Sequence, residues 1–552
     1  MPSLNPLNTV LGKRRAKHLL RRATFNYTKE QIESFASMNV TEAVNSLTSN
    51  VPYVLDEPYD PLPTSAPDGY WLSSTEHPNT FSGQGRKRAH ITAWWWHNAL
   101  NQVTLKYKLS FFLHTCFTVA KDSGVGLSPF FYDHLRLLDF YALGNIKVLA
   151  KKITLDNGML DYLDNTQNNN NNPNENYARE YLELFTILKG EQIGEGNYTN
   201  YTEVDVQQAA KVFSGFKKQF DRNGNIDSDT NLPMGYANVN RHDTSDKTFS
   251  SAFNSQVISG KNTVETMFDE LDDFVEMIFA QEATAKSYCR KLYRYFVKSD
   301  ISASAETDII TPLSQILINN NYEILSAVTA LLSSQHFYDA DDSDDTDNIV
   351  GAIIKSPLQL ISEVCSMLEV PYPDPVSDPL RFYNNFFRLF IHNTYFNASG
   401  MEFFNPDSVA GYPAYYQEPG YDRNWFSSNT LIGRYKLIES LIIGRNTITP
   451  NANIYTKLDT VLFVENKINP ELAKDPNTLV SEIADLFYPE SINADRINYF
   501  KQSLIEDSDD YYWRGAWLQY INTHSSEDKL TVKTRLDDLI ISMINAAEFQ
   551  LM

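Results

Sequence analysis

Apolar residues recur at helical spacing through most of this chain. In the opening segment, Ala16, Leu19, Leu20 and Ala23 fall on one side of a helix, with basic residues around the rest of the turn. Such a stripe lets a helix bury one face against a neighbouring element. We therefore predict a mainly α protein, a large multi-helical body in which β structure is confined to a small hairpin or sheet.

The predicted β insertion lies near residues 216–249. Asn223-Gly224 is typical of the tight turn of a hairpin, and the residues up to Phe249 would complete a small sheet. The surrounding run from Asp221 to Asp227 resembles a calcium loop in its Asp and Asn content. It has no downstream Glu at the spacing that such a loop requires, so we interpret it as a turn.

A chain of 552 residues exceeds what one ordinary core holds, so more than one domain, or one large body with insertions, is expected. An acidic stretch from Asp339 to Asp347 is typical of a linker. We predict a helical domain over 1–338, which carries the hairpin, and a C-terminal helical subdomain over 348–552. Polar loops are expected at 51–85 and 399–424.

The formal net charge of −22 repels a phosphate backbone, so we expect no general nucleic-acid binding by this acidic protein. Basic residues gather between Lys13 and Arg22, and we interpret them as a solvated helix face that pairs with the acidic remainder. No apolar run reaches about 18 residues, so no transmembrane segment is expected and the chain should be soluble. No signal peptide is visible at its start.

Aromatic residues make up 13% of the chain, and Trp94, Trp95 and Trp96 are consecutive. One interpretation is that they fill helical cores, and another is that they line clefts, sugar platforms or interfaces. The three cysteines, Cys116, Cys289 and Cys365, are widely spaced. They form no zinc or disulfide pattern, and we expect each to be a small buried hydrophobe.

The most informative stretch is the polar helix expected from Asn174 to Leu188. At about 100° per residue, its charged and amide side chains share one face, while Tyr and Leu residues occupy the other. The members of this face are Glu175, Asn176, Arg179, Glu180 and Glu183. Both Glu175–Arg179 and Arg179–Glu183 are i,i+4 pairs. The face is either a solvated ion-pair network or the wall of a cleft, where carboxylates with different pKa values would serve acid–base chemistry or bind a metal.

A second polar cluster, Arg241-His242-Asp243 with Lys247, follows the predicted hairpin. His-Asp neighbours orient an imidazole or bind a metal when they lie in a loop at a cleft. Elsewhere, His90, His97 and His114 lie in the aromatic helical region without an HExxH pattern. The GxSxG, P-loop and GxGxxG motifs are also absent, so the sequence offers no zincin, α/β-hydrolase, NTPase or dinucleotide signature.

Several of these stretches occur in an order that resembles a bacterial family known as domain of unknown function 1800. The run from Ala16 to Phe25 is similar to the family's "HLLRRAxFG" opening, and Tyr107 to Val119 is similar to its aromatic "FWHNHF" helix. In that helix His114 stands at the first histidine and Cys116 at the second. The central family signature matches Ala142 to Asn145, Leu163 to Asn165 and Asn174 to Glu180.

Three later stretches complete the resemblance, which spans roughly residues 13 to 440. They are His242-Asp243 with Lys247 to Phe249, then Arg290 to Leu292 with Phe296-Val297, and finally Asn405-Pro406, Val409 to Tyr412, Trp425 and Arg434. The resemblance implies no established reaction. It implies a protein that is often exported, with an extracytoplasmic location, and one whose neighbours include a sulfatase-like or phosphatase-like family.

These patterns lead to one leading hypothesis and two alternatives. The leading hypothesis is an extracytoplasmic enzyme that acts on a surface polymer or saccharide by acid–base or metal-assisted chemistry. Its catalytic candidates are Glu175, Arg179, Glu180, His242 and Asp243, and its binding candidates are Asn174, Asn176, Lys247, His114 and Trp425. A divalent metal is the candidate cofactor. The alternatives are a non-catalytic scaffold for a sulfatase-like partner and a carbohydrate-binding surface protein.

The leading hypothesis makes one geometric demand. His242 and Asp243 should approach the helix that begins near Asn174, despite some sixty intervening residues.

Overall fold

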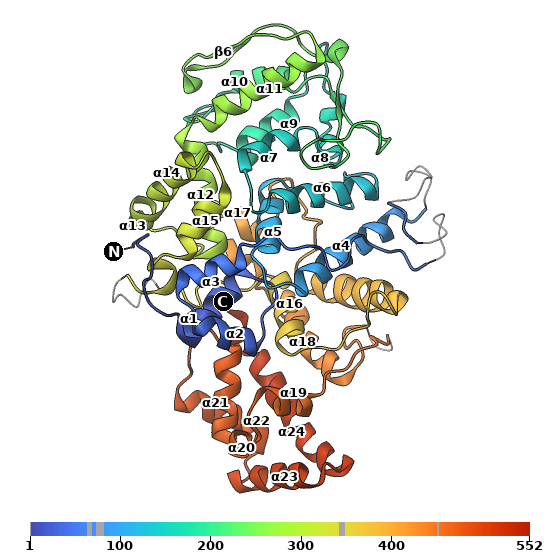
Figure 1. Ribbon diagram of the computed structural model, residues 1–552, viewed down its shortest axis with the longest axis vertical. Coiled ribbons are helices and arrows are strands. Elements are labelled where there is room, and N and C mark those ends of the chain that lie inside the picture. The colour runs from blue at the N-terminus through green and yellow to red at the C-terminus, as the bar shows by residue number, and fades with distance from the viewer. Residues whose placement is uncertain (1, 63–68, 73–81, 342–347, 450–451) are drawn as a thin grey trace.

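The computed structural model describes residues 2–62, 69–72, 82–341, 348–449 and 452–552. Its chain folds into a mainly helical molecule, elongated along one axis, as Figure 1 shows. The acidic linker expected at 339–347 and the loop expected at 51–85 fall partly outside the described residues. Within the described residues, no helix combines the length and the apolar character needed to cross a membrane.

The middle of the molecule contains the N-terminal helices and the helices that follow the first long loop (Figure 1). They are α1 (Gly12–Ala23), α2 (Lys29–Ala36), α3 (Val40–Leu47), α4 (Gln84–Leu100), α5 (Lys106–Cys116) and α6 (Ser128–Tyr141). In α1, Ala16, Leu19, Leu20 and Ala23 are all buried, which confirms the predicted apolar stripe. Thr28 and Gln31 form the capping box that begins α2.

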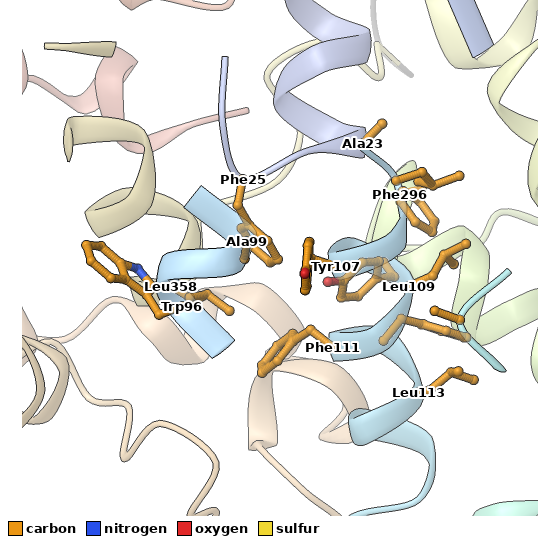
Figure 2. Close-up of a cluster of buried hydrophobic side chains, with 14 of the residues drawn as sticks. Ala23, Phe25, Trp96, Ala99, Tyr107, Leu109, Phe111, Leu113, Phe296 and Leu358 are labelled. Carbon is orange, nitrogen blue, oxygen red and sulfur yellow. The ribbon is translucent and has the colours of Figure 1, made fainter. Parts of the chain in front are cut away.

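The tryptophans of α4 form part of the core. Trp94, Trp95 and Trp96 point in different directions around the helix, yet all three are fully buried, so this part of α4 is surrounded by protein on every side. Figure 2 shows Phe25 converging with Tyr107 and Phe111 of α5 in this part of the core. Much of the aromatic content therefore fills helical cores, and Cys116, Cys289 and Cys365 are buried and unpaired, as expected.

The upper part of the molecule in Figure 1 holds the polar helix and the β structure. Its helices are α7 (Ile146–Ile153), α8 (Asn157–Tyr162), α9 (Glu175–Glu180), a π-helical segment (Tyr181–Phe185), α10 (Glu203–Val212) and α11 (Val264–Phe279). Three two-stranded antiparallel sheets accompany them: β1 (Gln192–Gly194) with β2 (Asn197–Tyr198), β3 (Phe216–Lys217) with β4 (Tyr236–Ala237), and β5 (Lys247–Thr248) with β6 (Val257–Ile258).

The hairpin predicted near residues 216–249 differs in detail from the observed one. Asp221 to Gly224 does form a turn, in which the Gly224 amide donates to the Asp221 carbonyl oxygen at 3.0 Å. The paired strands lie farther out, however, with Phe216 opposite Ala237. The β1–β2 sheet was not expected, because strands of two or three residues are too short to show a period-two pattern.

Helices on the left of the view in Figure 1 continue the chain after α11. They are α12 (Glu282–Phe296), α13 (Ala303–Ala305), α14 (Thr311–Asn319) and α15 (Ile324–Leu332), with a π segment at Glu306–Ile310. The rest of the chain returns to the middle as α16 (Pro357–Met367), a π-helix (Leu380–Phe396), α17 (Pro413–Tyr416) and α18 (Thr430–Ile443). The lower end holds α19 (Thr460–Lys467), α20 (Pro470–Ala473), α21 (Pro476–Phe487), α22 (Ala494–Ile505), α23 (Asp510–Thr523) and α24 (Ser526–Ile544).

Short 3-10 turns connect these elements. They cover Asn165–Gln167, Val239–Arg241, Ser251–Phe253, His336–Tyr338, Tyr421–Trp425 and Ala547–Gln550.

Two arginines of α1 join the beginning of the chain to its later parts. The Arg21 side chain is buried and lies 3.0 Å from the buried Glu363 carboxylate of α16. Arg22 is also buried and donates hydrogen bonds to four backbone carbonyl oxygens, those of Phe296, Val297, Ile349 and Met552. The solvated basic face expected for α1 was therefore wrong at these two positions. It was also wrong at Lys17, which is buried and donates to the Asp485 carbonyl oxygen at 2.6 Å. Most of these partners lie hundreds of residues away in the sequence.

Candidate functional site

The polar helix α9 begins where the sequence predicted. The Asn174 side chain caps the helix by accepting from the Asn176 amide at 3.0 Å. The Asn174 amide donates to Oδ1 of the buried Asn168 at 3.0 Å, and Asn176 Nδ2 donates to the Leu163 carbonyl oxygen at 3.3 Å. In this structure, the two asparagines attach the start of α9 to the preceding turn.

The regular α-helix ends at Glu180, sooner than expected. Residues Tyr181–Phe185 adopt a π-helix, in which each turn holds more residues than an α-helical turn. This change rotates Glu183 away from the position that a uniform 100° step predicts. Glu183 instead forms an ion pair with Lys189 and accepts a hydrogen bond from the Tyr201 hydroxyl at 3.2 Å.

Arg179 is held between two carboxylates. Its guanidinium lies 3.3 Å from Glu175, which confirms the predicted i,i+4 pair, and donates to Glu203 of α10 at 2.9 Å. The predicted Arg179–Glu183 pair was wrong, because Glu203 takes that place and the π-helix redirects Glu183. Hydrogen bonding to Arg179 also holds the pKa of Glu203 below its ordinary value.

Glu180 has a different environment from its neighbours. Its side chain is partly buried, and no hydrogen bond or ion pair to it is found within the described part of the chain. Desolvation, with a smaller contribution from the negative charge of Glu183, raises the pKa of Glu180 from 4.5 to about 6. A carboxyl group with this pKa populates both protonation states near neutral pH.

In the second predicted cluster His242 and Lys247 are buried, whereas Arg241 is exposed. His242 Nε2 lies 3.2 Å from the Glu270 carboxylate of α11, and His242 Nδ1 lies 2.8 Å from the Ser214 carbonyl oxygen. The Lys247 ammonium lies 2.7 Å from the other Glu270 oxygen, and all three side chains are shielded from solvent. The result is a compact charged network beneath the β5–β6 hairpin.

Asp243 lies at the edge of this network. Its carboxylate accepts from the Ser245 amide at 2.9 Å and lies 3.8 Å from the Lys247 ammonium. Burial opposes its ionisation, but the hydrogen bonds from Ser245 and the positive charge of Lys247 outweigh this effect and lower the pKa of Asp243. Asp243 is therefore the more accessible, ionised member of the pair with His242.

The two clusters are attached to the same turn but lie near different ends of α10. Asn168, which binds the start of α9, also accepts a hydrogen bond through its carbonyl oxygen from the Gly215 amide at 3.2 Å. Gly215 has a φ of +83°, and a Cβ there would lie 3.0 Å from the His242 amide nitrogen. Glycine thus permits the approach of the His242 loop to the end of α10.

Arg179, in contrast, reaches Glu203 at the first turn of α10. An α-helix rises 1.5 Å per residue, so the two ends of α10 lie about 15 Å apart. No hydrogen bond or ion pair joins His242 or Asp243 to the α9 carboxylates in the described ranges. A single site that contains both clusters remains a prediction.

His114 and Trp425 lie outside both clusters. His114 Nε2 lies 3.1 Å from the Val119 carbonyl oxygen, and burial lowers the pKa of this histidine to about 3. Trp425 is buried against the rings of Tyr412 and Tyr415, with centroid distances of 5.7 and 5.9 Å. Both side chains pack in the protein interior.

A comparison with known protein families identifies the family of the chain. A family model described as a protein of unknown function, DUF1800, matches residues 18–551. The chain belongs to this family. The DUF1800 match extends beyond residue 440, where the motif resemblance ends, so the lower helices of Figure 1 are part of the family unit. No curated protein and no solved structure matches the chain.

Two residues that contact the two polar clusters, Glu270 and Glu203, were not identified from the sequence. Glu270 lies on the apolar stripe of α11 together with Met267, Leu271 and Phe274, and a carboxylate on a buried stripe is a signal for a buried partner. Glu203 gives no such signal, because an acidic residue is common in the first turn of a helix, where Glu203 lies in α10. Among the described residues, no three His, Cys, Asp or Glu side chains gather as a group that could hold a metal.

Proposed function

We propose that this DUF1800 protein is an extracytoplasmic enzyme that acts on a surface polymer or saccharide by acid–base chemistry, with Glu180 as the group that transfers the proton. The observation that carries the proposal is the environment of Glu180, a partly buried carboxyl group with no hydrogen-bond partner among the described residues. The extracytoplasmic location and the polymeric substrate rest on the family resemblance.

The neighbours of Glu180 support this role because they are already paired. Arg179 is held by Glu175 and Glu203, and Glu183 is held by Lys189, so each of these charges has a fixed partner. Glu180 is left to exchange a proton, and its raised pKa suits that task at neutral pH. Neighbouring carboxyl groups in unlike environments are a common basis for separate acid and base roles.

The other parts of the hypothesis concern cofactor and partner. Asp243, the accessible carboxylate of the second cluster, would be one ligand of the divalent metal in this hypothesis, although no group of three His, Cys, Asp or Glu side chains among the described residues forms a metal site. A sulfatase-like partner protein would act on the same polymer. Both are part of the proposal and require their own measurements.

The test is a polysaccharide digestion assay. The purified chain is incubated with a panel of bacterial surface polysaccharides, with and without added Mg²⁺ or Ca²⁺, and new reducing ends are measured. We expect Glu180→Gln to lose at least about a hundredfold in rate, since general acid–base catalysis contributes about 10²–10⁴-fold.

The matched control is Glu195→Gln, which makes the same chemical change at an exposed glutamate of the upper part. It should retain the wild-type rate. A Glu180→Gln protein that cleaves the polymer as fast as the control would refute the catalytic role. A wild-type protein that binds polysaccharide without cleaving it would instead favour the carbohydrate-binding alternative.

A further inference from the structure

A cleft outside both polar clusters has the properties of a binding site. It lies where α5, α12, α17 and the end of the π-helical segment meet, near the centre of Figure 1. Its volume is about 240 Å³. Sites for drug-sized ligands span about 300–1,000 Å³, so this cleft suits one ring with its substituents.

Two cations lie in the cleft. The Lys291 ammonium donates to the Leu184 carbonyl oxygen at 2.6 Å, which leaves its other N–H groups available for a ligand. The Arg294 guanidinium lies over the Tyr421 ring at 4.7 Å. Its buried Nε has no hydrogen-bond partner in the part of the chain that the structure describes. A buried donor without a partner favours a ligand that accepts hydrogen bonds.

The local charge is opposite to that of the whole protein. The chain carries a net charge of −22, yet Lys291 and Arg294 face one carboxylate in the cleft, that of Glu418. Glu418 lies 3.8 Å from Arg294, and 74% of its side chain is exposed, so it neutralises the cleft only in part. Burial raises the pKa of the Cys116 thiol, which keeps this group uncharged. A positive cleft in an acidic protein selects anions.

Aromatic and hydroxyl side chains complete the walls. The rings belong to Phe112, Tyr295, Tyr415, Tyr416 and Tyr421, and the hydroxyls to Thr115 and Ser287. Tyr416 of α17 is 43% exposed and offers a ring at the rim. Ring faces pack against the C–H groups of a sugar. Thr115 and Ser287 already donate to backbone carbonyl oxygens, so their hydroxyl oxygens and the Glu418 carboxylate would accept hydrogen bonds from the OH groups of the sugar.

We propose that this cleft binds a single uronic acid residue, with its carboxylate on Arg294 and Lys291 and its ring against Tyr416. This inference does not depend on Glu180 or on catalysis. A uronic acid fits better than a neutral sugar because the two cations need a counter-charge. It fits better than an aromatic acid because the walls carry hydroxyl and carboxylate groups that pair with sugar OH groups.

The test is a titration of the full chain with D-glucuronate, D-glucose, benzoate and inorganic phosphate, followed by ligand-observed NMR and calorimetry. We expect saturable binding of glucuronate at one site. Glucose should bind at least about tenfold more weakly, because a charge-assisted hydrogen bond contributes about 1.5–3 kcal/mol. Arg294→Gln should remove the preference for glucuronate over glucose, and Tyr416→Ala should weaken binding of both sugars.

Two exposed residues supply matched controls. Arg423→Gln changes a cation that is 74% exposed near the same segment, and Tyr511→Ala removes an exposed ring of α23 at the lower end of Figure 1. Both should bind glucuronate as the wild type does. The proposal fails if glucuronate shows no saturable binding up to about 10 mM. It also fails if benzoate or phosphate binds as tightly, or if Tyr416→Ala binds glucuronate normally.

Discussion

Replacing Glu180 by glutamine should stabilise the protein, and the gain should depend on pH. The folded structure raises the pKa of Glu180 from 4.5 to about 6. The folded state therefore binds a proton more strongly than the unfolded chain does. Between about pH 4.5 and 6 the unfolded state holds fewer protons, so stability falls as pH rises through this window. Glutamine cannot ionise and escapes that loss.

The size of the effect follows from the shift in pKa. Each pKa unit corresponds to about 1.4 kcal/mol, so above pH 6 the variant can gain at most about 2 kcal/mol in free energy of unfolding. Glu180 is partly open to solvent, and screening reduces this to about 1 kcal/mol. For a chain of 552 residues, that amounts to a rise of about 1 °C in melting temperature.

Urea unfolding followed by fluorescence at pH 4 and at pH 8 resolves this difference better than a thermal scan. The variant and the wild type should match at pH 4, and the variant should be more stable at pH 8. Glu195→Gln, at an exposed glutamate, should follow the wild type at both values. If Glu180→Gln lowers stability at pH 8 by more than about 2 kcal/mol, Glu180 belongs to a structural network and the reasoning is refuted.

Three further predictions concern the other charged groups. Glu270→Gln should lower the free energy of unfolding in urea by about 3–5 kcal/mol, because the buried Lys247 then keeps only Asp243, 3.8 Å away, as a counter-charge. A loss under about 1 kcal/mol would contradict the buried network. Glu203→Gln should lower the free energy of unfolding by less than about 1 kcal/mol, since the Arg179–Glu203 ion pair is partly exposed. A larger loss in the same assay would show that this ion pair is more important for stability than its exposure indicates. Burial lowers the pKa of Lys291, so this side chain loses its positive charge at a lower pH than an ordinary lysine. Calorimetry should therefore show that the affinity for glucuronate falls as pH rises through that lowered pKa. An affinity that does not depend on pH would exclude Lys291 from the site.

Much of the helical framework could be predicted from local sequence. The apolar stripe of α1 depends on residues within one or two helical turns, and it is found as expected. The capping box of Thr28 and Gln31 at the start of α2 is equally local. Arg21 and Arg22 were misjudged because most of their partners, such as Glu363, lie hundreds of residues away in the sequence. Local patterns show that a residue is charged, but they do not show which distant carbonyl or carboxylate it meets.

The candidate site was predictable to a similar extent. The start of the polar helix near Asn174 and the Glu175–Arg179 pair follow from local sequence and helix geometry, and both are present. The π-helix after Glu180 could not be foreseen, because a shift in backbone hydrogen bonding depends on the packing of the surrounding helices. That shift separates Glu183 from Arg179. Glu180, just before the π-helix, has no hydrogen-bond partner in the described structure, and the proposed function depends on this feature.

The most direct test of the account is the titration of the Glu180 carboxyl group itself. The chain is labelled with ¹³C at the glutamate carboxyl carbons, and the Glu180 signal is assigned by its loss in Glu180→Gln. The account predicts a titration midpoint near pH 6, clearly above the ordinary glutamate value of 4.5. A midpoint at or below 4.5 would show that Glu180 is solvated or ion-paired, and it would contradict the role of this residue in proton transfer.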